Sequence, residues 1–170
     1  MVFHPVHHNG NTQASDEEVA AIEALVSELI GCPYADGESD KPRLLTLDDI
    51  LFITPYNHQR RKLQDALGPY AKVGTVDKFQ GQEAAVVIIS MCASDASESP
   101  RGMEFLFSKN RLNVAISRAK CLAIVVANPS LKDTTVSNLS QMALVNLFCQ
   151  LAEQGTQPTP DISHKKTVMG

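Results

Sequence analysis

The chain has 170 residues, which suits one domain, and its 44% hydrophobic and 20% charged residues are typical of a water-soluble globular protein. A formal net charge of −4 argues against a freestanding binder of duplex DNA, because such binders need a strong basic excess to neutralise phosphates. No apolar run of about 18 residues occurs and the first residues lack a secretory signal, so we expect neither a membrane span nor secretion.

The cysteines and histidines do not indicate a metal site. Cys32, Cys92, Cys121 and Cys149 lie far apart, without a C-x-x-C pair. That spacing argues against a zinc site or a disulfide framework and suits a reducing cytosol, so we expect a cytoplasmic protein. The isolated histidines are typical of solvated loops, and we expect no bound metal.

The first part of the chain predicts a strand at residues 1–6, a polar loop at residues 7–14 and then a helix. Ser15-Asp16-Glu17-Glu18 matches a capping box, in which the Ser15 hydroxyl and the Glu18 carboxylate both cover free helix amides. A helix of about 16 residues should follow, because apolar residues recur on one helical stripe. These residues are Val19, Ile22, Val26, Leu29 and Ile30. Residues 31–43 hold proline, glycine and acidic residues, and predict a solvated loop.

The middle of the chain predicts three strands, at residues 50–54, 72–76 and 85–91. The last of these contains four consecutive β-branched residues, as expected of a parallel strand covered on both faces. Between the first two strands, Asn57 can cap a helix that ends at Gly68-Pro69. Its buried side should consist of Leu63, Ala66 and Leu67.

The last part of the chain predicts a polar loop at 94–102, a helix at 110–120, an apolar strand at 121–127 and a final helix at 139–153. The final helix should bury Leu139, Met142, Val145, Phe148 and Leu151. We assign residues 1–154 to one domain and residues 155–170, with their prolines, to a flexible tail.

Alternation of apolar strands with helices predicts an α/β fold, with a mainly parallel sheet flanked by helices on both faces. In such sheets ligands meet the loops at the carboxyl ends of strands. Three loops that we place there are rich in polar residues, and we look for the function in them.

The first polar segment is Ile53-Thr54-Pro55-Tyr56-Asn57-His58-Gln59. A hydroxyl and free helix amides at the carboxyl end of a strand suit contact with a phosphate. Alternatively, Thr54-Pro55 only shapes a turn and Asn57 only caps a helix.

The second polar segment runs from Gly74 to Glu83 in the order Gly-Thr-Val-Asp-Lys-Phe-Gln-Gly-Gln-Glu. Gly81 would let the backbone approach a ligand closely, and Glu83 can accept hydrogen bonds from a ribose. The alternative is an ordinary polar loop in which Asp77 acts as a cap.

The third polar segment, Arg111-Leu112-Asn113-Val114-Ala115-Ile116-Ser117-Arg118-Ala119-Lys120, is expected on a helix. Arg111, Ser117 and Arg118 would lie within two turns of one another. An arginine at a domain boundary can reach a γ-phosphate bound by another domain and stabilise the charge that develops as the phosphoryl group leaves. A surface ion pair is the alternative for a lone arginine.

In this order and spacing, the three segments resemble motifs IV, V and VI of superfamily 1 helicases, close to the branch with the RNA-decay helicase Upf and the Dna-type nuclease-helicases. The patterns there are T-P-Y-x-x-Q, T-V-D-x-F-Q-G-x-E and R-L-N-V-A-x-S/T-R-A-K. This chain has ITPYNHQ, GTVDKFQGQEAAVVIIS and RLNVAISRAK. The likeness covers residues 44–128 and implies the second RecA-like motor domain of an ATP-dependent helicase, a hydrolase that acts on ATP.

The resemblance implies a role for each matching position. Arg118 matches the arginine finger, and Glu83, after Gly81, matches the carboxylate that holds the nucleotide sugar. Gln59 and Asn113 are expected to line the nucleotide cleft. The positions expected to contact single-stranded nucleic acid, or to couple it to the ATP cleft, are Thr54, Thr75, Lys78, Gln80 and Ser90.

The sequence has no G-x-x-x-x-G-K-S/T loop and no D-E pair after an apolar strand, the groups that hold ATP and Mg²⁺. We therefore expect a C-terminal fragment that is inactive as an ATPase alone, with ATP and Mg²⁺ held mainly by an N-terminal motor domain of the same polypeptide. A fused nuclease domain would also fit the resemblance. The expected partner is single-stranded nucleic acid, with DNA favoured over RNA. The alternatives are a non-catalytic module with a motor-like fold that binds nucleic acid or protein, and an unrelated doubly wound nucleotide-binding protein.

Overall fold

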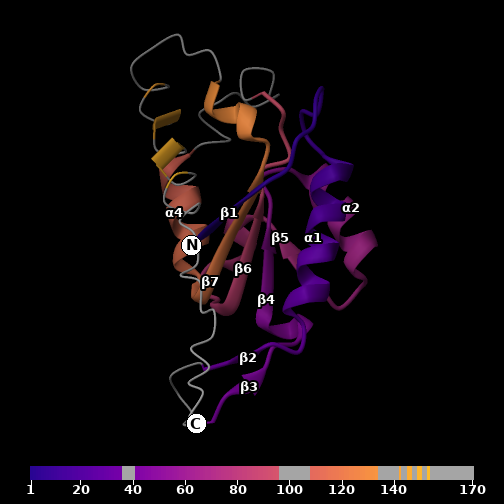
Figure 1. The fold of residues 1–170 in the computed structure, drawn as a ribbon, viewed down its shortest axis with the longest axis vertical. Coiled ribbons are helices and arrows are strands. Elements are labelled where there is room, and N and C mark those ends of the chain that lie inside the picture. The colour runs from indigo at the N-terminus through magenta and orange to yellow at the C-terminus, as the bar shows by residue number, and fades with distance from the viewer. Residues whose placement is uncertain are drawn as a thin grey trace, which may run out of the picture.

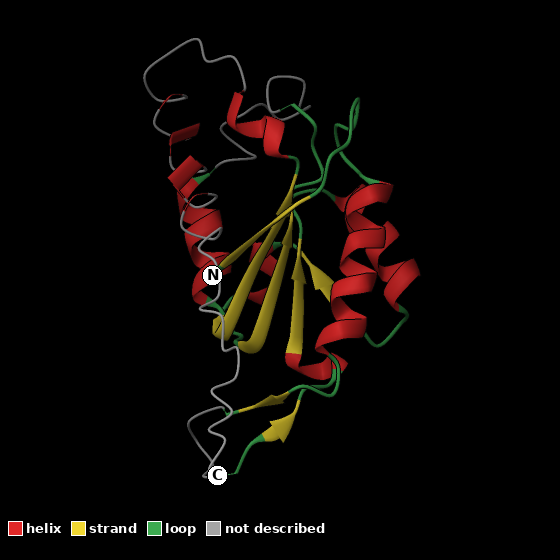
Figure 2. Ribbon diagram, viewed as in Figure 1, coloured by secondary structure: helices red, strands yellow, loops and turns green. Residues whose placement is uncertain are grey.

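The computed structural model describes residues 1–35, 41–95 and 108–133, together with residues 142, 145, 146, 149, 150 and 153. Within these residues it has one five-stranded sheet in the order β1-β7-β6-β4-β5, and every strand pair in it is parallel (Figures 1 and 2). Its strands are β1 (Val2–Pro5), β4 (Ile50–Ile53), β5 (Lys72–Gly74), β6 (Ala84–Ser90) and β7 (Ala119–Ala127).

Helices cover both faces of the sheet. Helices α1 (Asp16–Leu29) and α2 (Asn57–Leu67) lie on one face, and α4 (Lys109–Ser117) lies on the other (Figure 1). Short 3₁₀ helices, η1 (Leu47–Asp49), η2 (Val76–Phe79) and η3 (Pro129–Asp133), complete the connections. The predicted α/β fold with a parallel sheet between helices is therefore confirmed.

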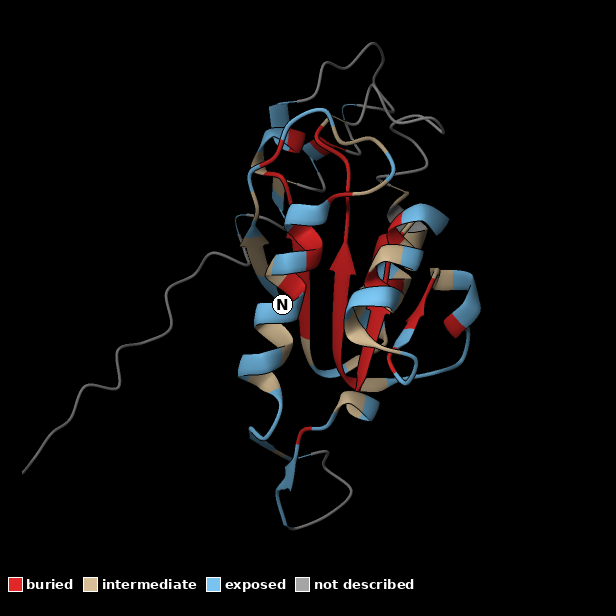
Figure 3. Ribbon diagram, turned by 90° about the vertical axis from the view of Figure 1, so that its right-hand side faces the viewer, coloured by how far each residue is buried: buried red, intermediate tan, exposed pale blue. Residues whose placement is uncertain are grey.

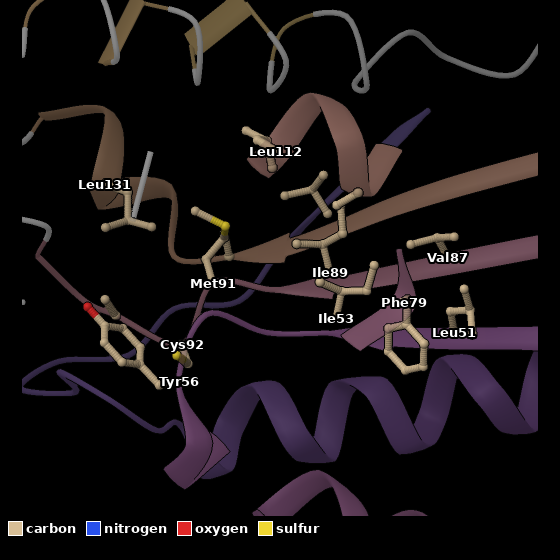
Figure 4. Close-up of a cluster of buried hydrophobic side chains, with 14 of the residues drawn as sticks. Leu51, Ile53, Tyr56, Phe79, Val87, Ile89, Met91, Cys92, Leu112 and Leu131 are labelled. Carbon is tan, nitrogen blue, oxygen red and sulfur yellow. The ribbon is translucent and has the colours of Figure 1, made fainter. Parts of the chain in front are cut away.

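The central strands are buried on both faces, so alternate residues enter two separate cores (Figure 3). Leu51 and Ile53 pack with Val87 and Ile89 beneath α4 (Figure 4), while Phe52 packs beneath α1 and α2. Burial on both faces explains why these strands are continuous apolar runs rather than alternating ones.

The strands all point the same way, which gives the sheet two distinct edges. We call the edge at which β1, β4, β5, β6 and β7 end the carboxyl edge, and the edge at which they begin the amino edge. Figure 1 shows the carboxyl edge at the top, beside the first turn of α1. No helix in the described parts of the chain is long and apolar enough to cross a membrane.

Several local predictions about the first half of the chain were wrong. The Glu18 carboxylate does not complete a capping box, because it turns into the domain, although the Ser15 hydroxyl does accept the Glu18 amide. Asn57 is the first residue of α2 rather than its cap, and Ala66 is exposed. Ile30, predicted on the buried stripe of α1, is 43% exposed.

Other differences concern the loops and the last helix. The loop predicted at residues 31–43 contributes an antiparallel pair, β2 (Pro33–Tyr34) with β3 (Arg43–Leu44). Val145 is buried as predicted, but Met142 is 47% exposed. Most of the predicted helix at 139–153, most of the polar loop at 94–102 and the whole tail at 155–170 lie outside the described residues.

Candidate functional site

Two of the polar segments meet α4 in a hollow at the carboxyl edge. Thr54 follows β4 and Thr75 follows β5, and both line this hollow together with Arg111. Most of the other lining is apolar and comes from Ile53, Pro55, Val76, Ile89, Met91, Leu112 and Ala115. Thr54 is fully buried, and its hydroxyl lies 3.9 Å from the Cys92 sulfur, whereas Thr75 is half-buried. We call this the threonine hollow.

A second and more polar hollow, of about 280 Å³, lies next to it. It is lined by Val76, Asp77, Gln80, Arg111, Val114 and Arg118. Val76, Asp77 and Arg111 border both hollows, so η2 and α4 form a shared wall between them. Residues of all three polar segments therefore line these two neighbouring hollows, and we call this second space the arginine hollow.

Arg118 is the least satisfied polar side chain of the site. It is half-buried, and its Nε atom is buried without a hydrogen-bond partner. No ion pair joins its guanidinium to any acid in the described residues, whereas Arg111 lies 3.8 Å from Asp77. Buried polar atoms are normally paired, so an unpaired arginine in a hollow beside a second arginine is suited to receive an anion.

Arg118 and the loop around Gly81 lie at the amino edge rather than the carboxyl edge. The backbone oxygen of Arg118 accepts the amide of Ala84 at 3.0 Å, which places Glu83 beside Arg118 at the start of β6 and β7. Gly81 has a φ of +79° that favours glycine, and both Gly81 and Glu83 are exposed. Our expectation that all three polar loops belong to the carboxyl edge was wrong, because the second segment crosses the face of the sheet from one edge to the other.

The remaining candidate residues of the second and third segments, Gln80, Asn113 and Lys78, differ in their position relative to the hollows. Gln80 is exposed and lines the arginine hollow, while Asn113 is exposed on α4 and lines neither hollow. The Lys78 ammonium donates to the backbone oxygen of Val73 at 2.8 Å and lies 5.5 Å from the centre of the Phe79 ring. Lys78 is thus folded back against its own domain.

Gln59 and Ser90 are fully buried, and their polar atoms are used within the domain. The Gln59 amide donates to the Ser90 hydroxyl at 2.9 Å, and its oxygen accepts the Ser15 amide at 2.8 Å. The Ser90 hydroxyl in turn donates to Glu18 at 2.6 Å. In this conformation neither side chain reaches a hollow, so the direct contacts expected of them are not part of the site as the structure shows it.

These two residues belong to a buried polar network at the carboxyl edge that sequence reasoning missed. Glu18 accepts the Cys92 amide at 3.0 Å and lies 3.0 Å from the His8 ring, whose other nitrogen is 2.7 Å from the Ser94 hydroxyl. Glu18, His8 and Ser94 are all buried. His8 therefore is not the solvated loop residue that we expected, and the capping-box spacing gave a misleading signal for Glu18.

Cys92 lies at the centre of this network in an unusual conformation. Its φ of 53° is the only positive value at a non-glycine residue in the described parts of the chain. Burial, with a smaller contribution from the Glu18 charge, raises the pKa of its thiol well above the ordinary value. A buried, protonated thiol is chemically inert, so Cys92 has a structural role in holding the turn after β6.

Comparisons with known proteins agree with the geometry. Residues 4–130 match the family model described as AAA domain. The RNA helicase Mov10l1 of Homo sapiens is 39% identical over 111 residues, which are 60% of this chain and 9% of that protein. The probable RNA helicase armi of Drosophila melanogaster is 39% identical over 99 residues, 51% of this chain and 8% of that protein.

A third relative is named as a DNA helicase. The DNA polymerase alpha-associated DNA helicase A of Schizosaccharomyces pombe is 42% identical over 79 residues, 45% of this chain and 12% of that protein. The chain thus spans about a tenth of the length of these relatives. The family match, the parallel sheet and the three converging segments together show that the chain belongs to the AAA-domain family, as the C-terminal motor-domain region of a superfamily 1 helicase.

Proposed function

We propose that this chain is the second motor domain of an ATP-dependent helicase and that it supplies the arginine finger. The observation that supports this most is Arg118, which lines a hollow beside Arg111 and whose buried Nε atom has no hydrogen-bond partner among the described residues. Its fixed positive charge and its fork of donors suit the equatorial oxygens of a transferring γ-phosphate.

The chain offers groups that fit a triphosphate but does not offer the whole binding site. Arg118, Arg111 and Gln80 supply donors in one hollow, and Glu83 at the adjacent edge has an exposed carboxylate suited to a ribose. The sequence has no phosphate-binding loop, so ATP and Mg²⁺ would be held mainly by a first motor domain. Mg²⁺ would neutralise charge on the β- and γ-phosphates, and Arg118 would stabilise the charge that develops between the two domains.

Single-stranded nucleic acid is the polymer we propose at the carboxyl edge, where Thr54 and Thr75 border the threonine hollow. Arg111 and Asp77 border both hollows and give a physical route by which the nucleic acid and the phosphate could affect each other. Two of the three relatives described above are named as RNA helicases, so the preference for DNA drawn from the sequence has no support from their names. RNA and DNA are therefore both to be tested.

The first prediction concerns Arg118 in the polypeptide that carries both motor domains. We expect Arg118→Ala to lower the rate of ATP hydrolysis stimulated by nucleic acid by about 10³-fold or more, as for other arginine fingers. Arg118→Lys should remain strongly impaired, because an ammonium lacks the guanidinium fork. ATP binding, measured by titration with a fluorescent analogue, should change far less than turnover.

The matched control is Arg61→Ala, which removes the same side chain from the exposed surface of α2. Turnover should remain normal in this control. Near-normal turnover in Arg118→Ala would overturn the arginine-finger assignment. Absence of ATP hydrolysis in the unaltered two-domain polypeptide, with nucleic-acid binding retained, would favour the non-catalytic module instead.

A further inference from the structure

The polar loop at residues 7–14, between β1 and α1, is fixed to the carboxyl edge by buried hydrogen bonds. We call it the edge loop, and in Figure 1 it rises above the first turn of α1, beside the upper end of the sheet. The Asn11 amide donates to the Ser94 hydroxyl at 3.0 Å, and the Asn11 oxygen accepts the Ser94 amide at 2.7 Å. The side-chain amide of Asn128 donates to the His8 oxygen. The edge loop is therefore anchored to the segments that follow β6 and β7.

The buried network beneath the edge loop is costly to form. Glu18 and His8 lie inside the domain, where polar and ionisable groups lose their hydration and must be paired. Every hydrogen-bond partner that the Glu18 carboxylate has in the described residues lies in the edge loop or in the end of β6 and the turn after it. The network thus holds these segments in one arrangement above the strands. A loop that is already ordered loses little conformational entropy when it binds a ligand, which favours binding.

The edge loop also carries exposed polar side chains that do not take part in the buried network. His7, Asn9 and Gln13 are exposed, and none of them makes a hydrogen bond or ion pair with another described residue. Together they present an imidazole and two carboxamides, which can donate and accept hydrogen bonds and, for His7, stack on a base. None of the residues 7–14 is acidic.

Acidic residues at the start of α1 lie beside the edge loop, and their negative charge affects which part of a nucleic acid could bind to it. Asp16 is 2.5 Å from the Lys62 ammonium, and Glu17 accepts Asn11 and Ser15 at 2.8 and 2.9 Å. A hydrogen bond from its own backbone amide, together with those from Ser15 and Asn11, lowers the pKa of Glu17, so this carboxylate stays ionised near neutral pH. A phosphate next to Glu17 would be repelled, whereas bases and sugars would not.

We propose that the edge loop is a further contact for single-stranded nucleic acid, directed at bases and sugars rather than phosphates. The proposal rests on the proposed function, which puts the nucleic acid at the carboxyl edge with Thr54 and Thr75. The turn after β6 connects the two places, because Cys92 contacts Thr54 through its sulfur and Glu18 through its amide. A single strand that leaves the threonine hollow toward α1 meets the edge loop.

The test is the affinity of the two-domain polypeptide for short fluorescein-labelled single-stranded RNA and DNA, measured by fluorescence anisotropy. The variant combines His7→Ala, Asn9→Ala and Gln13→Ala, which keep the formal net charge and break no hydrogen bond between described residues. We expect affinity to fall about ten-fold, in line with the loss of several modest contacts, while ATP hydrolysis without nucleic acid stays normal. A larger loss with RNA than with DNA would assign a contact to the 2′-hydroxyl.

Two further variants distinguish failure of the edge-loop proposal from failure of the proposed function. The combination of Arg61→Ala and Asp65→Ala removes exposed polar groups from α2 without changing the net charge, and it should bind normally. Thr75→Ala tests the proposed function alone. Weaker binding in Thr75→Ala with normal binding in the edge-loop variant would overturn the edge-loop proposal only. Failure of the unaltered protein to bind either RNA or DNA would overturn both.

Discussion

Glu18 and Arg118 are polar side chains that are both removed from water, wholly or in part, but they differ in their hydrogen bonding. Glu18 is fully buried and its carboxylate contacts Ser90, Cys92 and His8. Arg118 is half-buried and its Nε atom has no partner. A group with all its hydrogen bonds made stabilises the fold, whereas an unsatisfied donor at a hollow is available for a ligand. We therefore assign Glu18 to the stability of the fold and propose Arg118 for ligand binding.

The stability of the fold provides the test for Glu18. Glu18→Ala leaves a hydroxyl, a backbone amide and an imidazole buried without their partner, so we expect the free energy of unfolding to fall by about 3–5 kcal/mol. Glu18→Gln keeps the volume and one acceptor and should cost less. Urea denaturation followed by circular dichroism measures both. Glu17→Ala, one residue earlier and exposed, is the control, and an equal effect in both positions would contradict the role given to the network.

Single residues also mark the limit of what the sequence can predict. The resemblance to superfamily 1 helicase motifs implied roles for Arg118, Thr75 and Gln80, and the structure brings all three to the two hollows. Glu18 was not identified, because a glutamate three residues after a serine has the same spacing as a capping box whether its carboxylate turns outward or inward. Only the three-dimensional positions of Ser90 and Cys92 decide between the two.

At the scale of elements, the segment from β5 through η2 to β6 connects the two hollows. It leaves the carboxyl edge at Thr75, forms the shared wall with α4 and returns to the amino edge at Glu83. The turn into η2 is tight at Gly74. A Cβ atom there would lie 2.5 Å from the Lys78 side chain and 3.0 Å from the buried Phe79 ring.

Gly74→Ala should therefore displace η2. We expect the free energy of unfolding to fall by about 1–3 kcal/mol, as for other overpacked sites, and the affinity for single-stranded nucleic acid to fall as Thr75 moves. Gly68→Ala, at the end of α2, is the matched control: its φ of +90° makes alanine strained by about 1–2 kcal/mol, but no atom lies near the added Cβ. Urea denaturation measures the stability of both variants, and fluorescence anisotropy measures their affinity for single-stranded nucleic acid. Unchanged affinity in Gly74→Ala would contradict the role of η2 in positioning Thr75.

Elements with strong local signals were predicted well, and those set by tertiary contacts were not. Strands β4, β6 and β7 follow from their continuous apolar residues, and α1 follows from its Ser15 cap and apolar stripe. The β2–β3 pair was missed because its four residues have no alternating pattern. Its position depends on tertiary contacts: the Tyr34 hydroxyl donates to Asp49, and the Arg43 guanidinium lies over the Tyr34 ring and near the Asp49 carboxylate.

At the scale of the whole molecule, charge is the property that decides how nucleic acid would be bound. The chain has 15 basic and 19 acidic residues. Three of the cations described near the carboxyl edge are already engaged: Lys62 with Asp16, Arg111 with Asp77, and Lys78 with a backbone oxygen. Lys132, in η3 after β7, is exposed. Affinity should then come mainly from hydrogen bonds, stacking and apolar contact in the threonine hollow, with few phosphates neutralised.

The dependence of binding on salt tests this property of the whole domain. Each phosphate neutralised on a single strand contributes about −0.7 to the slope of log affinity against log salt concentration. With at most about two phosphates neutralised, we expect a slope of about −1.4 or shallower for the 170-residue chain. Lys62→Gln should leave the slope unchanged, because the Lys62 ammonium is paired with Asp16. A slope of about −3 or steeper would show that phosphate contacts dominate, and it would count against a site built on the threonine hollow and the edge loop.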